Sequence, residues 1–221
     1  MPTRLAELRA FLRIDDQATF PLWLKIVVTL LYIYISRGVW QQYSALNFLW
    51  FSHLGFMGAV LALWTENRLL ASMALLNTFV ADGVGWTLDL IVALVSGRHP
   101  FGATAYMFDA RIPLFIRGLS LFHVAVPVLL AWMVFKLRYD RRAIVAQTLF
   151  AWCVLILCLT LTNPALNLNC VWGPGTQRQH FMPAWLYFLI LMAYVPLAFY
   201  LPLHLVITRL LKWDRPREPA T

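Results

Sequence analysis

Five side chains that could take part in acid–base or nucleophilic chemistry lie inside long apolar segments of the sequence. They are Ser52, His53, Asp82, Asp89 and His123. Ionisable groups are costly in the hydrocarbon core of a membrane, and they usually face the interior of a helix bundle or a water-filled cavity. Their positions therefore predict a buried polar layer between helices.

The residue types in this layer are those of an activated serine nucleophile. His123 would take the proton of the Ser52 hydroxyl, and Asp82 would orient the imidazole and balance its charge. Asp89 is the alternative carboxylate. His53 points about 100° away from Ser52 on an ideal helix, so it is a supporting residue rather than the base. The pattern indicates hydrolysis or transfer of an acyl group.

The oxyanion of such a reaction needs hydrogen-bond donors. Asn77 and Asn169 are candidates, as is a backbone N–H group. The sequence does not select among these donors.

Depth estimates place the three principal residues in one layer of the membrane. At about 1.5 Å of rise per residue, Ser52 lies about 10 Å from the outer end of the second predicted span. His123 lies about 15 Å into the fourth span. Asp82 is near the middle of the third span, and less deep if Gly83 or Gly85 breaks that helix. An ester near the headgroups, with its acyl chain in the bundle, would reach this layer.

Each of these residues also has a structural interpretation. A serine in a membrane helix often packs against a neighbour or bonds its own backbone. A histidine such as His123 can bridge two helices by hydrogen bonds. Asp82 and Asp89 are seven residues apart, on one helix face, and can pair with arginines. These alternatives stay open beside the catalytic one.

Histidine and aspartate side chains are also metal ligands. No pair among His53, Asp82, Asp89 and His123 has the tight spacing of an HxxxH or ExxH motif. A haem between His53 and His123 would rest on matched depth alone. We therefore predict no cofactor and no metal.

The composition predicts that most of the surface faces lipid. The chain has 221 residues, of which 61% are hydrophobic and 13% are charged. Soluble domains carry about 25% charged residues. The net charge of +8 comes from short basic clusters between apolar runs, which is typical of juxtamembrane loops and excludes nucleic acid as the expected partner. We predict an all-α fold, a polytopic membrane helix bundle.

Six apolar segments are long enough to span a membrane, which takes about 20 residues. They lie near residues 21–39, 45–64, 69–95, 113–135, 143–162 and 183–211. We therefore divide the chain into an amphipathic N-terminal segment (1–20), a six-helix transmembrane domain (21–211) and a short tail (212–221).

The basic residues predict the orientation of the chain in the membrane. Lys and Arg are more frequent on the side that holds both termini, which predicts cytoplasmic termini and a bacterial inner membrane. The two long loops, 96–112 and 163–182, are then both on the outer side. Trp172 in the second loop would anchor it at the interface or cover a cavity that opens outward.

Several short segments resemble the YwaF-type bacterial membrane proteins, and they occur in the same order. Asn47–Phe56 (NFLWFSHLGF) resembles the second-helix segment of that group, and Glu66–Met73 (ENRLLASM) resembles the charged turn that follows it. Phe122-His123 resembles a later Ser-His-Gly helix. Asn167–Val171 and Pro183–Tyr187 resemble an Asn-containing loop and a final Pro-Trp-Tyr helix start. An AYMFDARIPLFIRGLSLFH-like stretch also resembles an uncharacterised bacterial membrane-protein set.

The YwaF group is similar to transmembrane acyltransferases and androgen-induced-protein lipid hydrolases, in which a Cys or Thr nucleophile works with an intramembrane His. The resemblance implies that Ser52 takes the nucleophile position and His123 the histidine position. His53 would replace a neighbouring Asp. Serine in place of cysteine needs a stronger base, because a few per cent of a free thiol is already thiolate at neutral pH.

Three functional hypotheses follow. The first is a membrane-embedded serine-type lipid hydrolase or acyltransferase. The second is a non-catalytic accessory subunit or lipid-binding scaffold of a larger membrane complex. The third is a small proton-coupled transporter that uses Asp82, Asp89 and His123 as a relay. The expected partners are membrane lipids in every case.

Overall fold

The computed structural model describes residues 20–42, 44–175 and 177–210. All regular structure in these ranges is helical, which confirms the predicted all-α bundle. The predicted amphipathic segment 1–20, except for Phe20, and the predicted tail 212–221 lie outside the described residues.

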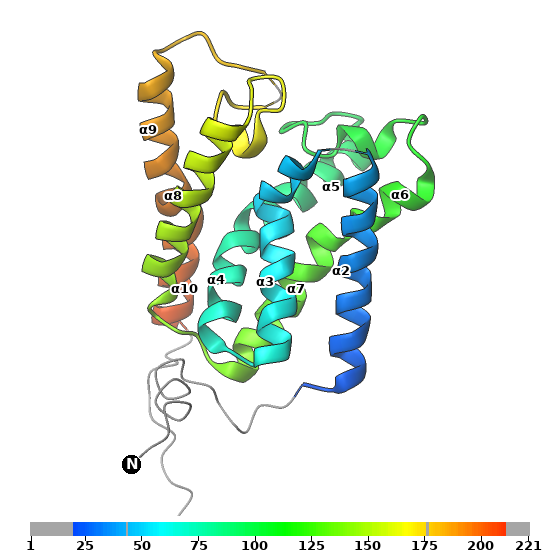
Figure 1. Cartoon of the computed structure of the whole chain (residues 1–221), viewed down its shortest axis with the longest axis vertical. Helices are drawn as coiled ribbons and strands as arrows, with labels where there is room; N and C mark the ends of the chain where they lie inside the picture. The colour runs from blue at the N-terminus through cyan, green and yellow to red at the C-terminus, as the bar shows by residue number, and fades with distance from the viewer. Residues whose placement is uncertain (1–19, 43, 176, 211–221) are drawn as a thin grey trace, which may run out of the picture.

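The described residues form six helical passes that run up and down the bundle (Figure 1). The first three passes are α2 (Leu22–Gln42), then η1 (Ala45–Leu49) with α3 (Phe51–Thr65), then α4 (Arg68–Thr78) with η2 (Phe79–Trp86) and α5 (Thr87–Ser96). The fourth and fifth are α6 (Leu114–Leu119) with α7 (Phe122–Leu137), then α8 (Ala143–Leu161). The sixth is α9 (Ala184–Tyr194) with η5 (Val195–Tyr200) and α10 (Leu201–Leu210). Short 3₁₀ turns, η3 (Ala105–Phe108) and η4 (Leu168–Cys170), lie in the two long loops.

The two long loops lie at the same end of the bundle, which we call the loop end (Figure 1). The described chain begins at Phe20 and stops at Leu210 at the opposite end, which we call the termini end. This arrangement follows from an even number of passes, since each pass reverses the direction of the chain.

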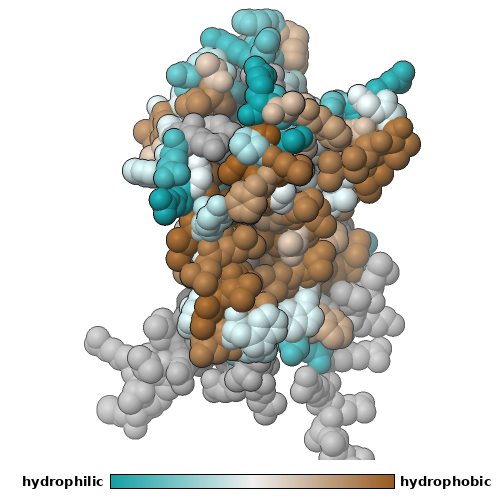
Figure 2. Space-filling model, turned by 90° about the vertical axis from the view of Figure 1, so that its right-hand side faces the viewer, coloured by the Kyte–Doolittle hydropathy of each residue, from teal (hydrophilic) through white to brown (hydrophobic). Residues whose placement is uncertain are grey.

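Five of the passes are long and apolar enough to cross a membrane. α3 is apolar but shorter. Large apolar side chains such as Leu30, Phe135 and Leu197 are exposed on outward helix faces. On the face beside α2 and α6, hydrophobic residues form a broad band below the hydrophilic loop end (Figure 2). Because so much outward apolar surface needs lipid to cover it, the chain is an integral membrane protein.

The centre of the bundle is α4, which packs against α3, α7 and α8. Its residues Ala71, Ala74 and Leu76 are almost completely buried. Gly55 of α3 lies so close to Thr78 that a side chain at position 55 would overlap it. Small residues at helix contacts let backbones approach closely, which is how membrane helices gain packing energy without a hydrophobic driving force.

The second pass departs from the predicted helix 45–64. Residues 45–49 form a 3₁₀ turn, Trp50 is extended (ψ 133°), and the α-helix begins at Phe51. Asn169 of the second loop stabilises this break, because its side chain accepts a hydrogen bond from Phe51 N (3.0 Å) and donates one to Leu49 O (2.7 Å). Ser52 is therefore in the first turn of α3 rather than well inside an α-helix.

The third pass is π-helical over Phe79–Trp86, a region that includes Gly83 and Gly85, the two residues named above as points where this helix could break. A side chain at Gly83 would lie 3.0 Å from Cβ of Pro127, so the missing side chain lets η2 contact α7 closely. Wide π-helical turns inside α-helices are rare and frequently occur at functional sites.

Candidate functional site

The carboxylate of Asp82 on η2 lies beside the imidazole of His123 on α7. Oδ1 of Asp82 lies 3.3 Å from Nδ1 of His123, and their side chains are only 15% and 16% exposed. The two atoms are not aligned as a hydrogen bond, since His123 Nδ1 has no hydrogen-bond partner in the described part of the chain. The contact is therefore an electrostatic one. With Nδ1 beside the carboxylate, Nε2 is the nitrogen left to take a proton.

Local structure explains why these two side chains meet. Asp82 is on the π-helical turns of η2, which Gly83 brings against Pro127 of α7. His123 is the second residue of α7 and so lies near the same level. The indole of Trp86 stacks on the imidazole, with ring centroids 5.1 Å apart and an interplanar angle of 19°. This stacking holds the plane of the His123 ring.

His53 is the second buried histidine of this region. Its ring contacts Phe48 (5.7 Å between centroids) and Phe122 (5.9 Å). Phe122 also contacts the ring of His123 at 4.1 Å, so it touches both histidines. The Nδ1 atom of His53 is buried, and the described residues offer it no hydrogen-bond partner. His53 therefore belongs to the same layer but makes no polar contact with the Asp82–His123 pair.

Ser52 is half-buried in the first turn of α3. Within the described ranges, no hydrogen bond joins its hydroxyl to His123 or to Asp82. The structure thus brings together two of the three predicted catalytic residues and leaves the third without a direct contact to them.

Two asparagines hold the residue just before Ser52. Asn77 of α4 donates a hydrogen bond to Phe51 O (2.6 Å), and Asn169 accepts one from Phe51 N. The Asn169 amide also donates to Leu49 O and to Sγ of Cys158, so both of its N–H groups are engaged. Both side chains position the start of α3, and Asn169 has no free N–H group for an oxyanion.

The backbone at the start of α3 supplies the other kind of predicted donor. The first N–H groups of a helix have no intrahelical acceptor. Phe51 N is capped by Asn169 and Leu54 N bonds Trp50 O. The described residues provide no acceptor for the N–H groups of Ser52 and His53 between them. The first turn of α3 is therefore the best remaining candidate for an oxyanion site.

Asp89 lies elsewhere, in the first turn of α5. Its fully buried carboxylate accepts hydrogen bonds from Phe101 N (2.8 Å), Thr104 N (2.8 Å) and Thr104 Oγ1 (2.7 Å). It holds the first long loop against the bundle. Of the two acidic residues in the third pass, only Asp82 contacts His123.

Sequence reasoning did not select Trp86, Gln147 or Tyr200. Gln147 and Tyr200 both bond the Oδ1 atom of Asn77, at 3.0 and 3.4 Å, and so complete its buried network. Trp86 follows Asp82 by four residues, a spacing that places side chains on one helix face. That spacing was a usable signal. The contacts of Gln147 and Tyr200 join helices that are far apart in the sequence, and no local sequence pattern predicts them.

Three of the candidate metal ligands of the sequence, His53, Asp82 and His123, lie in the same part of the bundle. No group of three or more His, Cys, Asp or Glu side chains in the described residues could hold a metal ion. His53 and His123 are linked through Phe122, whose ring contacts both.

Comparison with family models, curated proteins and solved structures finds no match to the chain. The resemblance to YwaF-type proteins thus stays a prediction. Any functional conclusion has to come from the site itself.

Proposed function

We propose that this integral membrane protein is a serine-type hydrolase or acyltransferase of acyl lipids. The observation that carries the proposal is the 3.3 Å contact between Asp82 and His123 in the interior of an apolar bundle. A carboxylate beside Nδ1 of an imidazole favours the tautomer whose Nε2 accepts a proton, which is the arrangement of a general base.

Each residue has a defined role in this reaction. His123 removes the proton of the Ser52 hydroxyl, Asp82 stabilises the imidazolium, and Ser52 attacks the lipid ester. The proton then passes from His123 to the departing alcohol, and water or a second alcohol takes the acyl group from Ser52. The N–H groups of Ser52 and His53 would stabilise the oxyanion. The N–H of the nucleophile itself serves in this way in serine proteases.

The distance between Ser52 and the Asp82–His123 pair has to shorten for this reaction. Catalytic hydrogen bonds are often long or poorly aligned without substrate and tighten when it binds. The Asn77 and Asn169 contacts hold the backbone of Phe51, so the adjustment falls on the side chains of Ser52 and His123. A lipid ester between the two residues would supply the driving force.

The test is acyl-lipid turnover by the purified protein in proteoliposomes, followed by mass spectrometry of released fatty acids and lysolipids. We expect turnover by wild type and by Ser96→Ala, whose exposed hydroxyl bonds only its own helix and the adjacent turn. Ser52→Ala and His123→Ala should abolish turnover while the protein stays folded. Equal turnover in wild type and Ser52→Ala, or none in folded wild type, would overturn the proposal.

A second candidate is a non-catalytic lipid-binding scaffold or accessory subunit of a membrane complex. It is favoured by the missing hydrogen bond between Ser52 and His123, together with the buried network of Asn77, Gln147 and Tyr200, which serves helix packing. This candidate predicts that the protein co-purifies with a larger complex and that Ser52→Ala and His123→Ala leave this complex intact. It also predicts that neither wild type nor these variants turn over acyl lipids.

A further inference from the structure

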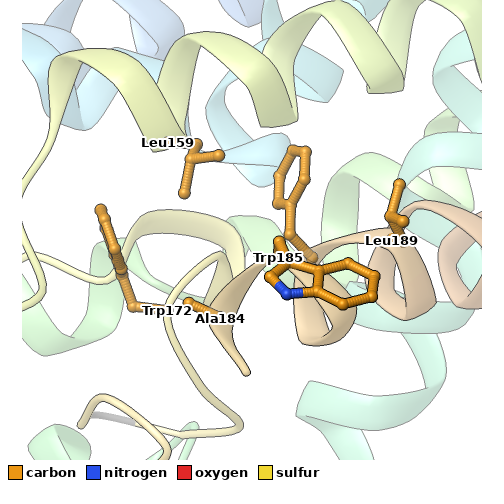
Figure 3. A pocket seen from close by; sticks show the side chains of 6 residues that line it. Leu159, Trp172, Ala184, Trp185 and Leu189 are labelled. Carbon is orange, nitrogen blue, oxygen red and sulfur yellow. The ribbon is translucent and has the colours of Figure 1, made fainter. Parts of the chain in front are cut away.

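An apolar pocket of about 420 Å³ lies between the loop-end halves of α8 and α9 (Figure 3). Leu159, Trp172, Ala184, Trp185, Phe188 and Leu189 line it. Trp172 comes from the second long loop and forms one wall. Pockets of this size are typical of sites for small molecules and lipid chains. None of the lining residues belongs to the Asp82–His123 region.

The pocket opens on the surface that faces the bilayer. Trp185 and Leu189 are 66% and 55% exposed, although both line the pocket. The four lining residues of α9 all lie within its first six residues, which cover about 8 Å of helix length. The pocket therefore lies at the boundary between headgroups and acyl chains, where the neighbouring molecule is a lipid.

The Trp172 wall is held by the buried side chain of Asn167. The Asn167 amide accepts a hydrogen bond from Trp172 N (2.8 Å) and donates to Gly173 O and Gly175 O. Trp172 O accepts a further hydrogen bond from Gln179 N (2.9 Å). Because the loop backbone is tied on both sides of the indole, the wall is preorganised and a ligand need not order it.

The side chain of Arg178 places a positive charge next to Trp172. The guanidinium of Arg178 lies 5.7 Å from the centre of the Trp172 ring, and its residue is exposed. No carboxylate in the described part of the chain pairs with Arg178. A positive group beside a wall residue of an apolar pocket complements a molecule that has an alkyl chain and a phosphate.

We propose that this pocket binds a phospholipid of the leaflet at the loop end, with an acyl chain in the pocket and the phosphate at Arg178. The apolar lining recognises the chain, and the charge of Arg178 selects the phosphate. The site is separate from the proposed reaction centre, and it stands whether or not the chain is an enzyme.

The test is native mass spectrometry of the full chain in detergent with added 1-palmitoyl-2-oleoyl phosphatidylglycerol. Wild type should retain one lipid. Ala184→Trp and Leu189→Trp, which place an indole in the pocket, should each weaken retention at least tenfold. Leu189 is on the exposed rim, so its variant keeps the fold if Ala184→Trp does not.

The headgroup contact is tested by Arg178→Gln, with Arg111→Gln as the matched control. A basic residue near a phosphate contributes about 1 kcal/mol, so Arg178→Gln should weaken retention about fivefold. Arg111 is exposed and pairs with Asp109, and its variant should bind like wild type. Unchanged lipid retention in both pocket-filling variants would contradict lipid binding in this pocket. Equal effects of the two arginine variants would contradict the placement of the phosphate at Arg178.

Discussion

Asp82 and Asp89 show how the surroundings of two like residues assign them different tasks. The carboxylate of Asp89 accepts three hydrogen bonds from the first long loop, whereas that of Asp82 faces an imidazole without an aligned hydrogen bond. A fully satisfied carboxylate is structural, and one that lacks aligned donors is available to stabilise a charge that forms during a reaction. We propose on this basis that Asp89 serves stability and that Asp82 serves the reaction.

Asn substitutions at these two positions should therefore have different effects. Asp82→Asn should lower acyl-lipid turnover about 100-fold or more, because the imidazolium of His123 loses its counter-charge. The melting temperature should change little. Turnover in proteoliposomes and thermal unfolding in detergent are the two measurements.

Asp89→Asn should have the opposite profile. It removes a hydrogen-bonded buried carboxylate and should destabilise the protein by roughly 2–3 kcal/mol, with less effect on turnover. If Asp82→Asn melted early and Asp89→Asn abolished turnover in a folded protein, the two assignments would be reversed.

The sequence predicted the Asp82–His123 contact in part. Depth estimates placed both residues in one layer, and the structure brings them within 3.3 Å. The missing contact of Ser52 was not predictable, since it depends on where α3 begins. That start is set by Asn169, which lies 118 residues further along the chain than Phe51.

At the scale of helices, most boundaries could be predicted from apolar runs alone. α8 spans Ala143–Leu161 against a predicted 143–162, and α9 to α10 spans Ala184–Leu210 against 183–211. The runs could not show the π-helical turns of η2 and η5, or the 3₁₀ turn before α3, because these depend on contacts between passes. These irregular turns therefore cannot be predicted from the apolar pattern of a single segment.

Asn169→Ala tests the contact between the second loop and α3. It leaves Phe51 N and Leu49 O without their partners, which should destabilise the protein by about 2 kcal/mol. The first turn of α3 should loosen, and turnover should fall with it. Asn163→Ala is the matched control, since the exposed Asn163 bonds only its own turn. Equal melting temperatures for the two variants would contradict this role.

The turn between α7 and α8 contains a buried carboxylate whose ionisation contributes to stability. Burial raises the pKa of Asp140. The hydrogen bonds and charge of Arg142 and the charge of Arg68 lower it by more, so the pKa of Asp140 is below its usual value. Asp140 is 1% exposed and lies 2.9 Å from Arg142. A folded pKa below the unfolded one stabilises the protein above the unfolded pKa, and this stability is lost as the pH falls through the folded pKa.

Thermal unfolding of wild type between pH 6 and pH 3 should therefore show a loss of stability at the acid end. Asp140→Asn should be less stable at pH 6 and should lose less on acidification, because its amide does not titrate. Parallel curves for the two proteins would exclude Asp140 as a source of the acid sensitivity.

At the scale of the whole molecule, charge and hydropathy are arranged along one axis. Hydrophobic residues form a band on the face beside α2 and α6, and both long loops lie at one end (Figures 1 and 2). The turn at the termini end between α7 and α8 carries Arg138, Arg141 and Arg142. Basic residues concentrate on the cytoplasmic side of membrane proteins, so we propose that the termini end faces the cytoplasm of a bacterial inner membrane.

Cysteine labelling in intact bacterial cells tests this orientation. Arg98→Cys lies at the loop end and Arg141→Cys at the termini end, and both positions are exposed. In a background without the loop cysteine Cys170, a membrane-impermeant maleimide should label position 98 in intact cells. Position 141 should react only after the membrane is permeabilised. The reverse pattern would mean that the chain has the opposite orientation.

Fluorophosphonate labelling of the purified protein in lipid nanodiscs tests most directly whether Asp82 and His123 activate Ser52. Wild type and Ser96→Ala should be labelled, Ser52→Ala should not, and His123→Ala should be labelled at least 100 times more slowly than wild type. Identification of Ser52 as the modified residue by peptide mass spectrometry would establish an activated serine in the bundle. Labelling that persists in Ser52→Ala, or that is as fast in His123→Ala as in wild type, would contradict the claim that Asp82 and His123 activate Ser52.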